Sequence, residues 1–592
     1  MCVPAGWSIF RCASLGGSWL AGLVFRLTER VRARYRAFEM QKPSQPESER
    51  PSVLGAGVEE AEAPATEELA VVTEAAPVPA AAAVDAAEVT RQAGRGGLAV
   101  AVAKAYFILQ GLVQQIALQR VLGLDGYGGW SSVNSLASAT YNPVIAMSIQ
   151  GVSRAVSSAN PAEQRATLRR VFTFHAVFAL LLAGAMYLLA PWIMRAWGAP
   201  HLTRAFLILC PLFVIYGLYA PLIGALNGQR LFTYQAGFDI LAATIRTAGL
   251  ALGAWWFVRR GLGVEGAAGA VVLGMAALLL VAFAVVGVGR SGSSQVVLTD
   301  YLGFVFPVMI GQTLLNLLLQ ADFWLLRLFA SQAAVAQGYT AVAADPLVGA
   351  YRATQVFSFL PYQLLISVNF VLFPMLATAV RDQDDAAIAR YVSTGIRIAV
   401  VVAGLMASVT SGLASALLTA VFGREAAALG ARSLELLALG FGAFAIFGVF
   451  TAVLNSLRKQ FESMAVTGFA ALVVAALCYT RVRGEAFGDT LLLRTATATS
   501  VGLVLATFGA AWLVKRAAGS VVAPITVLRV VGACAATVLF GRMLNPHGLV
   551  RTIGCSAMLA LFYIGILVLT KELSGSDLQL VRTVIARRAK RK

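Results

Sequence analysis

Charged side chains stand inside long apolar stretches of this sequence, where their types and spacing suggest ligand binding. Asp239 and Arg246 are seven residues apart and therefore share one face of a helix. A charge in an apolar environment is costly unless it meets a partner or a hydrated cavity. The pair is interpreted either as an ion pair through neighbouring helices that stabilises the fold, or as a binding site where Arg246 attracts an anionic group of a ligand and Asp239 modulates that attraction.

A second set of polar residues recurs every four positions. Gln312, Asn316 and Gln320 form one stripe on a helix, and Asp322 and Arg327 lie near its outer end. A polar stripe is unfavourable against lipid, so it faces either another helix or a cavity. Amides donate to and accept from hydroxyls, so the cavity alternative predicts a wall that contacts hydroxyl groups of a ligand.

Arg352 is the residue that we most expect to place a positive charge in a cavity. It lies near the start of the apolar stretch 347–378, which Pro361 and Pro374 interrupt. Proline kinks a membrane helix, and the kink is either a gate or a static bend. Gln114, in the first apolar stretch, is the remaining cavity candidate.

The sequence offers few residues for catalytic or metal-binding chemistry. The chain has three histidines and six cysteines, and no cysteine pair has CxxC spacing. No His/Asp/Glu cluster suggests acid–base work. We therefore expect no catalytic residue, no metal site, no cofactor and no enzyme activity. The alternatives are a membrane enzyme, such as a polymerase or ligase, and a purely structural membrane protein.

The elements that must position these residues are transmembrane helices. The 592 residues are 58% hydrophobic and 13% charged, whereas a soluble domain carries about 25% charged residues. Apolar stretches of 18 or more residues, each long enough to cross a bilayer, follow one another from about residue 97. The predicted fold is an all-α polytopic membrane protein with about 14 (12–14) helices. The spans lie near 98–122, 130–153, 171–194, 203–226, 233–258, 264–288, 301–329, 347–378, 392–421, 432–455, 463–480, 492–514, 522–541 and 550–570.

The two ends of the sequence differ from the apolar body. Residues 1–96 are predicted to be a disordered, low-complexity tail, rich in Ala, Pro and Glu, and 573–592 a basic tail. Basic loops such as 154–170 and the turn at Arg458 favour a cytoplasmic location for both tails. The net formal charge of +18 reflects either this loop bias or a cationic pathway for an anionic substrate.

An internal repeat divides the spans. The turn ALNGQRLF at 225–232 resembles VLNSLRKQF at 453–461, with Asn227 matching Asn455 and Arg230 matching Arg458. Six spans separate the two turns, so the repeat is parallel, as in transporters that alternate access around a site between two lobes. The predicted domains are an N-lobe (97–290), a C-lobe (291–516) and two additional spans (517–572). Weaker matches in the same order pair Gln110 and Gln114 with Gln312 and Asn316, and Tyr127 with Tyr351.

Four segments carry a resemblance to a known family. LQRVLGLDGYGGW at 118–130, SRAVS at 153–157, NGQRLF at 227–232 and YRATQVFSFLPYQLLISVNFVLFPML at 351–376 are similar to the polysaccharide branch of the multidrug/oligosaccharidyl-lipid/polysaccharide (MOP) exporter superfamily. The resemblance covers roughly residues 97–515, and its motifs are patterns of small and aromatic residues.

The resemblance implies a Wzx-type flippase of the bacterial inner membrane. Such a protein moves an undecaprenyl-diphosphate-linked oligosaccharide between leaflets for cell-surface polysaccharide biosynthesis. The expected partners are this substrate, membrane lipids, a coupling ion (H⁺ or Na⁺) and the polysaccharide polymerase machinery, and no nucleic acid. Two alternatives stay open. A MATE-like cation-coupled exporter usually carries an acidic residue in an early helix, but residues 98–122 contain none. Lipid II flippases carry several arginines in the first helix, where this chain has Gln114 and only Arg120.

Overall fold

The computed structural model describes residues 80–289 and 292–573, and within these ranges its regular elements are all helices. Eleven described helices are long and apolar enough to cross a membrane by length and composition. The helices are α2 (Ala80–Ser158), α3 (Gln164–Ala196), η2 (Pro200–Leu202), α4 (Thr203–Leu209), α5 (Pro211–Gly228), α6 (Phe232–Val258), α7 (Gly263–Val286), α8 (Leu298–Ala336), η3 (Ala341–Ala343), α9 (Ala344–Ser358), α10 (Leu360–Arg381), α11 (Asp385–Gly412), α12 (Ala414–Phe422), α13 (Arg424–Ser456), α14 (Gln460–Val482), α15 (Asp489–Ala518), α16 (Pro524–Met543) and α17 (Leu549–Leu569).

The predicted spans all find a helical counterpart. α2 covers the first two spans, and α9 and α10 together cover the eighth. Pro361 explains the break between α9 and α10, because it occupies the first turn of α10, where its missing N–H is not needed. α10 continues through Pro374. α2 begins at Ala80, inside the segment predicted to be a tail, and this stretch starts with alanines, the best helix formers.

The chain reverses direction within α2 at Gly123. This glycine has φ 74° and ψ −178°, outside the helical region. Tyr127 on one side donates a hydrogen bond to Gln115 Oε1 on the other, at 3.0 Å. Twelve residues of straight helix would separate the two by about 18 Å, so the two halves of α2 fold back on each other. The predicted spans 98–122 and 130–153 leave 123–129 as their connection, and the structure places the reversal at the first residue of that segment, Gly123.

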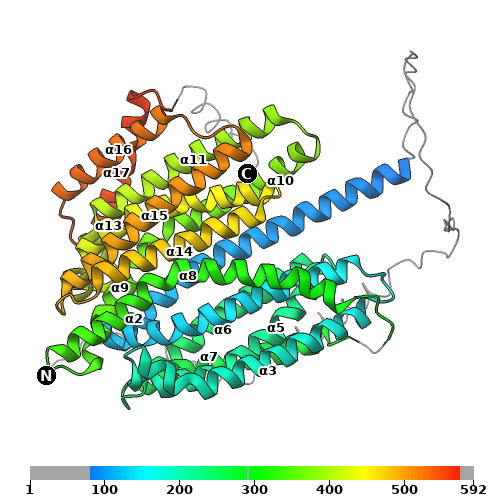
Figure 1. Ribbon diagram of the computed structural model, residues 1–592, viewed down its shortest axis with the longest axis horizontal. Coiled ribbons are helices and arrows are strands. Elements are labelled where there is room, and N and C mark those ends of the chain that lie inside the picture. The colour runs from blue at the N-terminus through cyan, green and yellow to red at the C-terminus, as the bar shows by residue number, and fades with distance from the viewer. Residues whose placement is uncertain (1–79, 290–291, 574–592) are drawn as a thin grey trace.

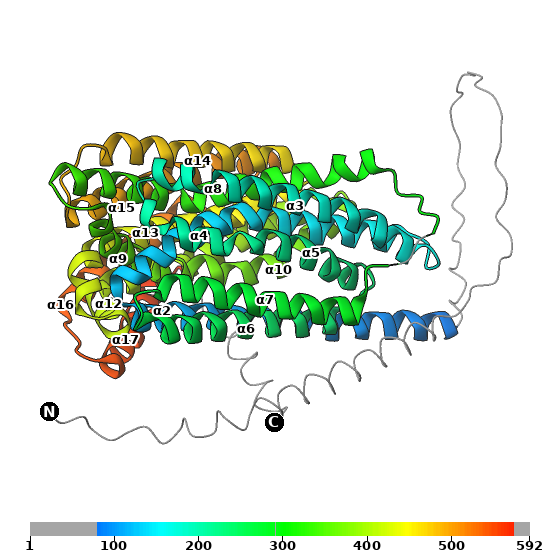
Figure 2. The ribbon, with the colours of Figure 1, turned by 90° about the horizontal axis from the view of Figure 1, so that it is seen from below.

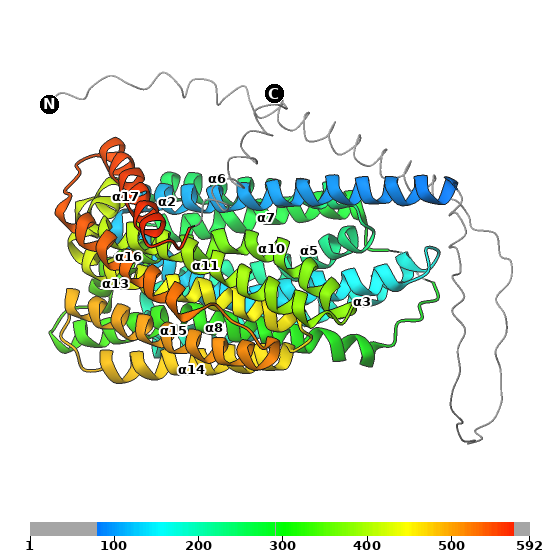
Figure 3. The same cartoon turned by 90° about the horizontal axis from the view of Figure 1, so that it is seen from above.

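The helices form two bundles with α16 and α17 beside them. In the first bundle, α2 packs against α5 and α6, α6 against α7, and α3 against α5. In the second, α13 packs against α9, α10, α11 and α15, and α14 against α8 and α15. The bundles meet where α2 contacts α8 and α9 (Figures 1 and 2). α16 and α17 pack on α11, at the side of the second bundle, as Figure 3 shows.

A buried carboxylate fixes α16 and α17 to α11. Glu572, just after α17, is 3% exposed and pairs with Arg397 of α11 at 2.8 Å and Arg529 of α16 at 3.2 Å. Thr526 donates to the same carboxylate. Burial alone would raise the pKa of Glu572, but the hydrogen bonds from Arg397, Arg529 and Thr526 hold this pKa below its ordinary value.

Successive helices run between two ends of the molecule. We call them the Arg154 end, where α2, α5, α10, α13 and α15 finish, and the Gly123 end, where α2 reverses. The basic loop 154–170 and the turn at Arg458 both lie at the Arg154 end. The even number of crossings predicted from these basic segments therefore agrees with the helix order.

The predicted repeat appears in the backbone of two turns. Arg230 and Arg458 both adopt a positive φ, at 63° and 59°. In each turn the arginine N–H bonds to the matching asparagine carbonyl, Asn227 or Asn455. The next N–H bonds to the carbonyl five residues before it, at 2.8 Å in both turns, which completes a Schellman cap. The sequence match between these turns thus reflects the same local geometry.

Candidate functional site

Arg352 lies where the two bundles meet, beside two other predicted site residues, Gln320 and Asp322. Its Nη2 donates to Gln320 Oε1 at 3.2 Å, and its guanidinium lies 4.2 Å from the ring centroid of Phe323. Tyr127 of α2 and Asp322 of α8 are close enough to interact with its charge. Arg352 remains half-buried. A cation held by an amide and an aromatic face is suited to an anionic ligand.

Asp322 anchors the second bundle from beneath Arg352. The carboxylate is 1% exposed and accepts from the Tyr351 hydroxyl at 2.7 Å, the Gln355 amide at 3.2 Å and Thr499 at 3.3 Å. The Phe323 N–H adds a fourth bond. These donors come from α8, α9 and α15, so Asp322 joins three helices and supports the backbone that carries Arg352.

The first bundle repeats this arrangement without the charge. Tyr127 and Tyr351 are each fully buried near the start of the second helix of their bundle. Each donates its hydroxyl to the preceding helix, Tyr127 to Gln115 and Tyr351 to Asp322. The repeat therefore keeps the tyrosine while the acceptor changes from a neutral amide to a carboxylate.

The rest of the polar stripe on α8 joins the two bundles. Asn316 is 5% exposed and accepts a hydrogen bond at 3.2 Å from Asn142 of α2. Its own amide donates to the Gln312 carbonyl at 2.8 Å. Gln312 is half-buried. The stripe is thus divided, with Asn316 in a contact between helices and Gln320 beside Arg352.

The predicted residues of the first bundle lie on α2 and α6, away from Arg352. Arg246 hydrogen-bonds Tyr216 of α5 and lies close to Tyr141 of α2, and these two rings are 4.6 Å apart. Asp239 lies near Tyr219. Gln114, 7% exposed, accepts from Thr247 of α6 at 3.2 Å. The structure therefore does not gather the nine candidate residues into one site.

Arg327 belongs to an ion-pair cluster at the Gly123 end. It is fully buried and pairs with Asp345 of α9. His201, from η2 of the first bundle, lies 3.1 Å from the same carboxylate and 3.5 Å from the guanidinium. Sequence reasoning missed Asp345 and His201, since neither has a spacing that indicates a partner 18 or 126 residues away.

Glycines let the bundles touch backbone to backbone at this end. A Cβ at Gly128 of α2 would overlap the carbonyl oxygen of Asp345, and one at Gly349 of α9 would overlap that of Leu124. Trp197 and Trp324 add contacts between the bundles, because the Trp197 indole donates to the Trp324 carbonyl at 2.9 Å. The glycines expected to form a turn therefore serve close helix packing.

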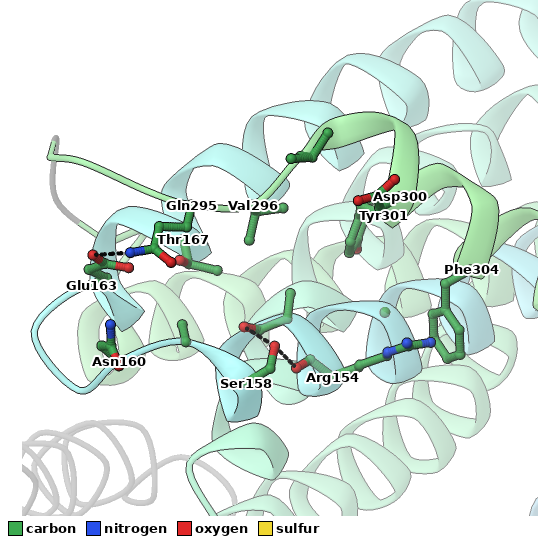
Figure 4. A pocket seen from close by; sticks show the side chains of 14 residues that line it. Arg154, Ser158, Asn160, Glu163, Thr167, Gln295, Val296, Asp300, Tyr301 and Phe304 are labelled. Carbon is green, nitrogen blue, oxygen red and sulfur yellow. Dashed lines mark hydrogen bonds between the residues drawn. The ribbon is translucent and has the colours of Figure 1, made fainter. Parts of the chain in front are cut away.

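At the Arg154 end, side chains rather than backbones join the bundles. His175 of α3 is fully buried between Ser148 Oγ at 3.0 Å and the Tyr301 hydroxyl at 2.7 Å. A cavity of about 400 Å³ lies beside Tyr301, and Arg154 and Phe304 are also among its lining residues (Figure 4). Sequence reasoning named Arg154 only as part of a basic loop.

An apolar groove of about 850 Å³ lies between the second bundle and α16. Its walls come from α11, α13, α15 and α16. Val400, Phe450 and Val531 are among its many aliphatic and aromatic side chains. Across residues 80–289 and 292–573, no group of three or more His, Cys, Asp or Glu side chains is placed to hold a metal ion.

Comparisons with known proteins agree with this architecture. Residues 93–380 match the family described as "Polysaccharide biosynthesis protein". The structure of the lipid II flippase MurJ in an inward closed conformation superposes with a TM-score of 0.62 at 13% identity, covering 79% of this chain and 98% of MurJ. No curated protein matches the chain by sequence.

Two further transporters share the fold. The MATE transporter VcmN of Vibrio cholerae gives a TM-score of 0.52 at 15% identity, over 73% of this chain and 97% of its own. A MOP superfamily transporter from Pyrococcus furiosus gives a TM-score of 0.52 at 14% identity, covering 75% of this chain and 96% of its own. The chain therefore has the fold of these transporters, which is the fold that the resemblance to MOP exporters implies.

Proposed function

We propose that this chain, a membrane transporter with the MOP fold, moves a lipid-linked oligosaccharide across the inner membrane for cell-surface polysaccharide biosynthesis. The observation that carries the proposal is the match of residues 93–380 to the polysaccharide biosynthesis protein family. In this proposal the lipid carrier is undecaprenyl diphosphate. The movement is alternating access, in which the two bundles rock around a cavity between them.

Arg352 and Gln320 supply the chemistry that the head group needs. In the proposed cycle the diphosphate approaches the half-buried guanidinium, and amides such as Gln320 and Gln312 bind sugar hydroxyls. Asp322 and Tyr351 hold this site in place from the interior of the second bundle. Arg246 on α6 is a further cation along the pathway, with Asp239 near it.

The apolar groove beside α16 is an argument for the proposal that the substrate is lipid-linked. A polyprenyl tail is too apolar to enter a hydrated cavity and stays in the bilayer during transfer. The groove that lies between α11, α13, α15 and α16 offers aliphatic side chains such as Val527 and Leu539. Because the tail is already in an apolar environment in the bilayer, the groove contributes packing contacts and not transfer out of water.

The Arg154 end is assigned to the cytoplasm in this proposal. Basic residues 154–170 and the turn at Arg458 lie there, and Lys/Arg-rich loops stay on the cytoplasmic side. Both tails then lie in the cytoplasm, where the substrate is assembled and from which it is collected. A coupling ion, H⁺ or Na⁺, resets the cycle, and polysaccharide polymerase machinery receives the product.

A second candidate is a cation-coupled exporter of small molecules, because MATE transporters share this fold. In that function an acidic residue such as Asp239 couples efflux to an ion gradient. Replacing Asp239 by Asn then abolishes ion-dependent efflux of a dye. In the favoured function, the same variant leaves dye efflux at its background value.

Depletion of the protein in its native host tests the favoured function. The fraction of lipid-linked oligosaccharide on the cytoplasmic leaflet is measured by its protection from an external glycosidase in intact spheroplasts. We expect the lipid-linked oligosaccharide to accumulate on the cytoplasmic leaflet on depletion. Wild-type protein is expected to clear it, and so is the control variant Arg381→Gln, which changes an arginine that is 73% exposed. Arg352→Gln is expected to clear it at a rate lower by about tenfold or more. No accumulation on depletion would overturn the proposal.

A further inference from the structure

The cavity at the Arg154 end is a polar pocket on the seam between the bundles. It measures about 400 Å³, within the range of small-ligand pockets. The first bundle contributes the end of α2 and the start of α3, and α8 of the second bundle supplies Asp300, Tyr301 and Phe304. Figure 4 shows these side chains arranged around one hollow.

The pocket carries charges of both signs at separate places. Arg154 extends toward Phe304, with its guanidinium 4.4 Å from the ring centroid. Glu163 lies on the opposite side of the hollow and accepts a hydrogen bond from Gln295 at 3.4 Å. Asp300 adds a second carboxylate. One cation and two anions are unfavourable for a bare phosphate and suit a ligand that carries an anionic and a cationic group together.

The pocket lies at the depth where lipid head groups lie. Two candidate spans, α3 and α8, begin at its walls. α8 also exposes apolar side chains near its start, with Phe306 40% and Ile310 48% exposed. In a bilayer these side chains face acyl chains. A phospholipid lying along this part of α8 would bring its head group to the pocket.

We propose that this pocket binds the head group of a zwitterionic phospholipid with a primary amine, with the phosphate at Arg154 and the ammonium at Glu163, the carboxylate on the opposite side of the hollow. Arg154 donates to phosphate oxygens, and a primary ammonium offers three N–H donors to the carboxylate. A trimethylated amine has no N–H donor, and a glycerol head group has no cation. Because the pocket is lined by α2 and α3 of the first bundle and by α8 of the second, the bound lipid contacts both bundles at the Arg154 end.

Binding is measured on the purified full-length protein by native mass spectrometry and by Tm in detergent. The probes are dioleoyl phosphatidylethanolamine, phosphatidylcholine and phosphatidylglycerol, with inorganic phosphate as a source of the anion alone. We expect phosphatidylethanolamine to bind about tenfold more tightly than the other two lipids and to raise Tm most. The proposal would be overturned if the three lipids bound equally or if phosphatidylglycerol bound best. It would also be overturned if inorganic phosphate raised Tm as much as phosphatidylethanolamine does.

Variants then locate the site. The double variant Glu163→Gln/Asp300→Asn is expected to bind phosphatidylethanolamine no better than wild type binds phosphatidylcholine. Arg154→Gln is expected to weaken the binding of phosphatidylethanolamine by about tenfold. Asp382→Asn, which changes an exposed carboxylate at the same end outside the pocket, is the matched control and keeps wild-type binding. Wild-type lipid preference in a folded double variant would place the lipid elsewhere and contradict the assignment.

Discussion

The Gly123 end and the Arg154 end join the same two bundles with different kinds of contact. At the Gly123 end, backbones meet at Gly128 and Gly349, and the buried Arg327–Asp345 pair reaches His201 of the first bundle. At the Arg154 end, the bundles meet through side chains such as His175 and Tyr301, and a polar cavity remains between them.

The difference indicates which end opens more easily. Separating the Gly123 end exposes a buried ion pair and breaks dense backbone packing, both of which are costly. Separating the Arg154 end breaks neutral hydrogen bonds beside a cavity that already holds polar groups. In this structure the Gly123 end is therefore the more firmly closed, and substrate entry from the Arg154 end requires the smaller loss of contacts.

The largest effect is expected from breaking the ion pair at the Gly123 end. Asp345→Asn leaves Arg327 charged and buried without its counterion, which costs about 3–5 kcal/mol. We expect a large fall in Tm in detergent, whereas Asp382→Asn, on the surface, leaves Tm unchanged. Replacing both partners, as Arg327→Met/Asp345→Leu, should recover much of the loss. A wild-type Tm for Asp345→Asn would contradict the firmer closure of this end.

The glycine contact comes next in size. Gly128→Ala places a methyl group against the Asp345 carbonyl and pushes α2 from α9, which costs roughly 1–3 kcal/mol. Gly111→Ala, on the same helix, meets no atom within 4 Å and serves as the control. We expect Gly128→Ala to lower Tm and Gly111→Ala to keep it. Equal Tm values would mean that the backbones are not in close contact.

A smaller effect is expected at the Arg154 end. Tyr301→Phe removes one of the two hydrogen bonds to His175 and costs about 1 kcal/mol. We therefore expect a small fall in Tm in detergent. Phe174→Leu, which keeps the Tyr301 hydroxyl, is the comparison. If Tyr301→Phe lowers Tm as much as Asp345→Asn does, the contrast between the two ends is lost.

The smallest effect concerns Glu572, which fixes α16 and α17. Its folded pKa lies below the ordinary value of 4.5, so its stabilising contribution is present above pH 4.5 and is lost as the pH falls through the folded pKa. We expect the Tm difference between wild type and Glu572→Gln to be constant from pH 8 to 5 and to shrink below about pH 4.5. A difference that grew on acidification would contradict the pairing with Arg397 and Arg529.

Much of the fold was predictable because span length is set by the bilayer. Every apolar stretch of sufficient length became a helix or a pair of helices, and Pro361 fixed the break between α9 and α10. The repeat was also readable, since the matching turns at Arg230 and Arg458 share one cap geometry. The reversal lies inside the predicted connection 123–129, but the sequence did not show which glycine makes it, because Gly123 in the turn and Gly128 in a tight helix contact look alike in a sequence.

The site was predictable only in part. Periodicity identified Gln312, Asn316 and Gln320 as one face of a helix, but not which helix lies opposite each residue. Asn316 meets Asn142, 174 positions away, whereas Gln320 meets Arg352. Partners that are brought together by tertiary packing leave no local signal. For the same reason His201 and Asp345 around Arg327 went unrecognised.

Transfer of a lipid-linked oligosaccharide in vesicles tests the central claim most directly. The purified protein is reconstituted with a fluorescent undecaprenyl-diphosphate oligosaccharide, and the labelled fraction in each leaflet is followed with a membrane-impermeant quencher. We predict transfer by wild type and Arg381→Gln, and a rate lower by about tenfold or more for Arg352→Gln at unchanged Tm. Transfer at the rate of protein-free vesicles, or equal rates for wild type and Arg352→Gln, would contradict the account.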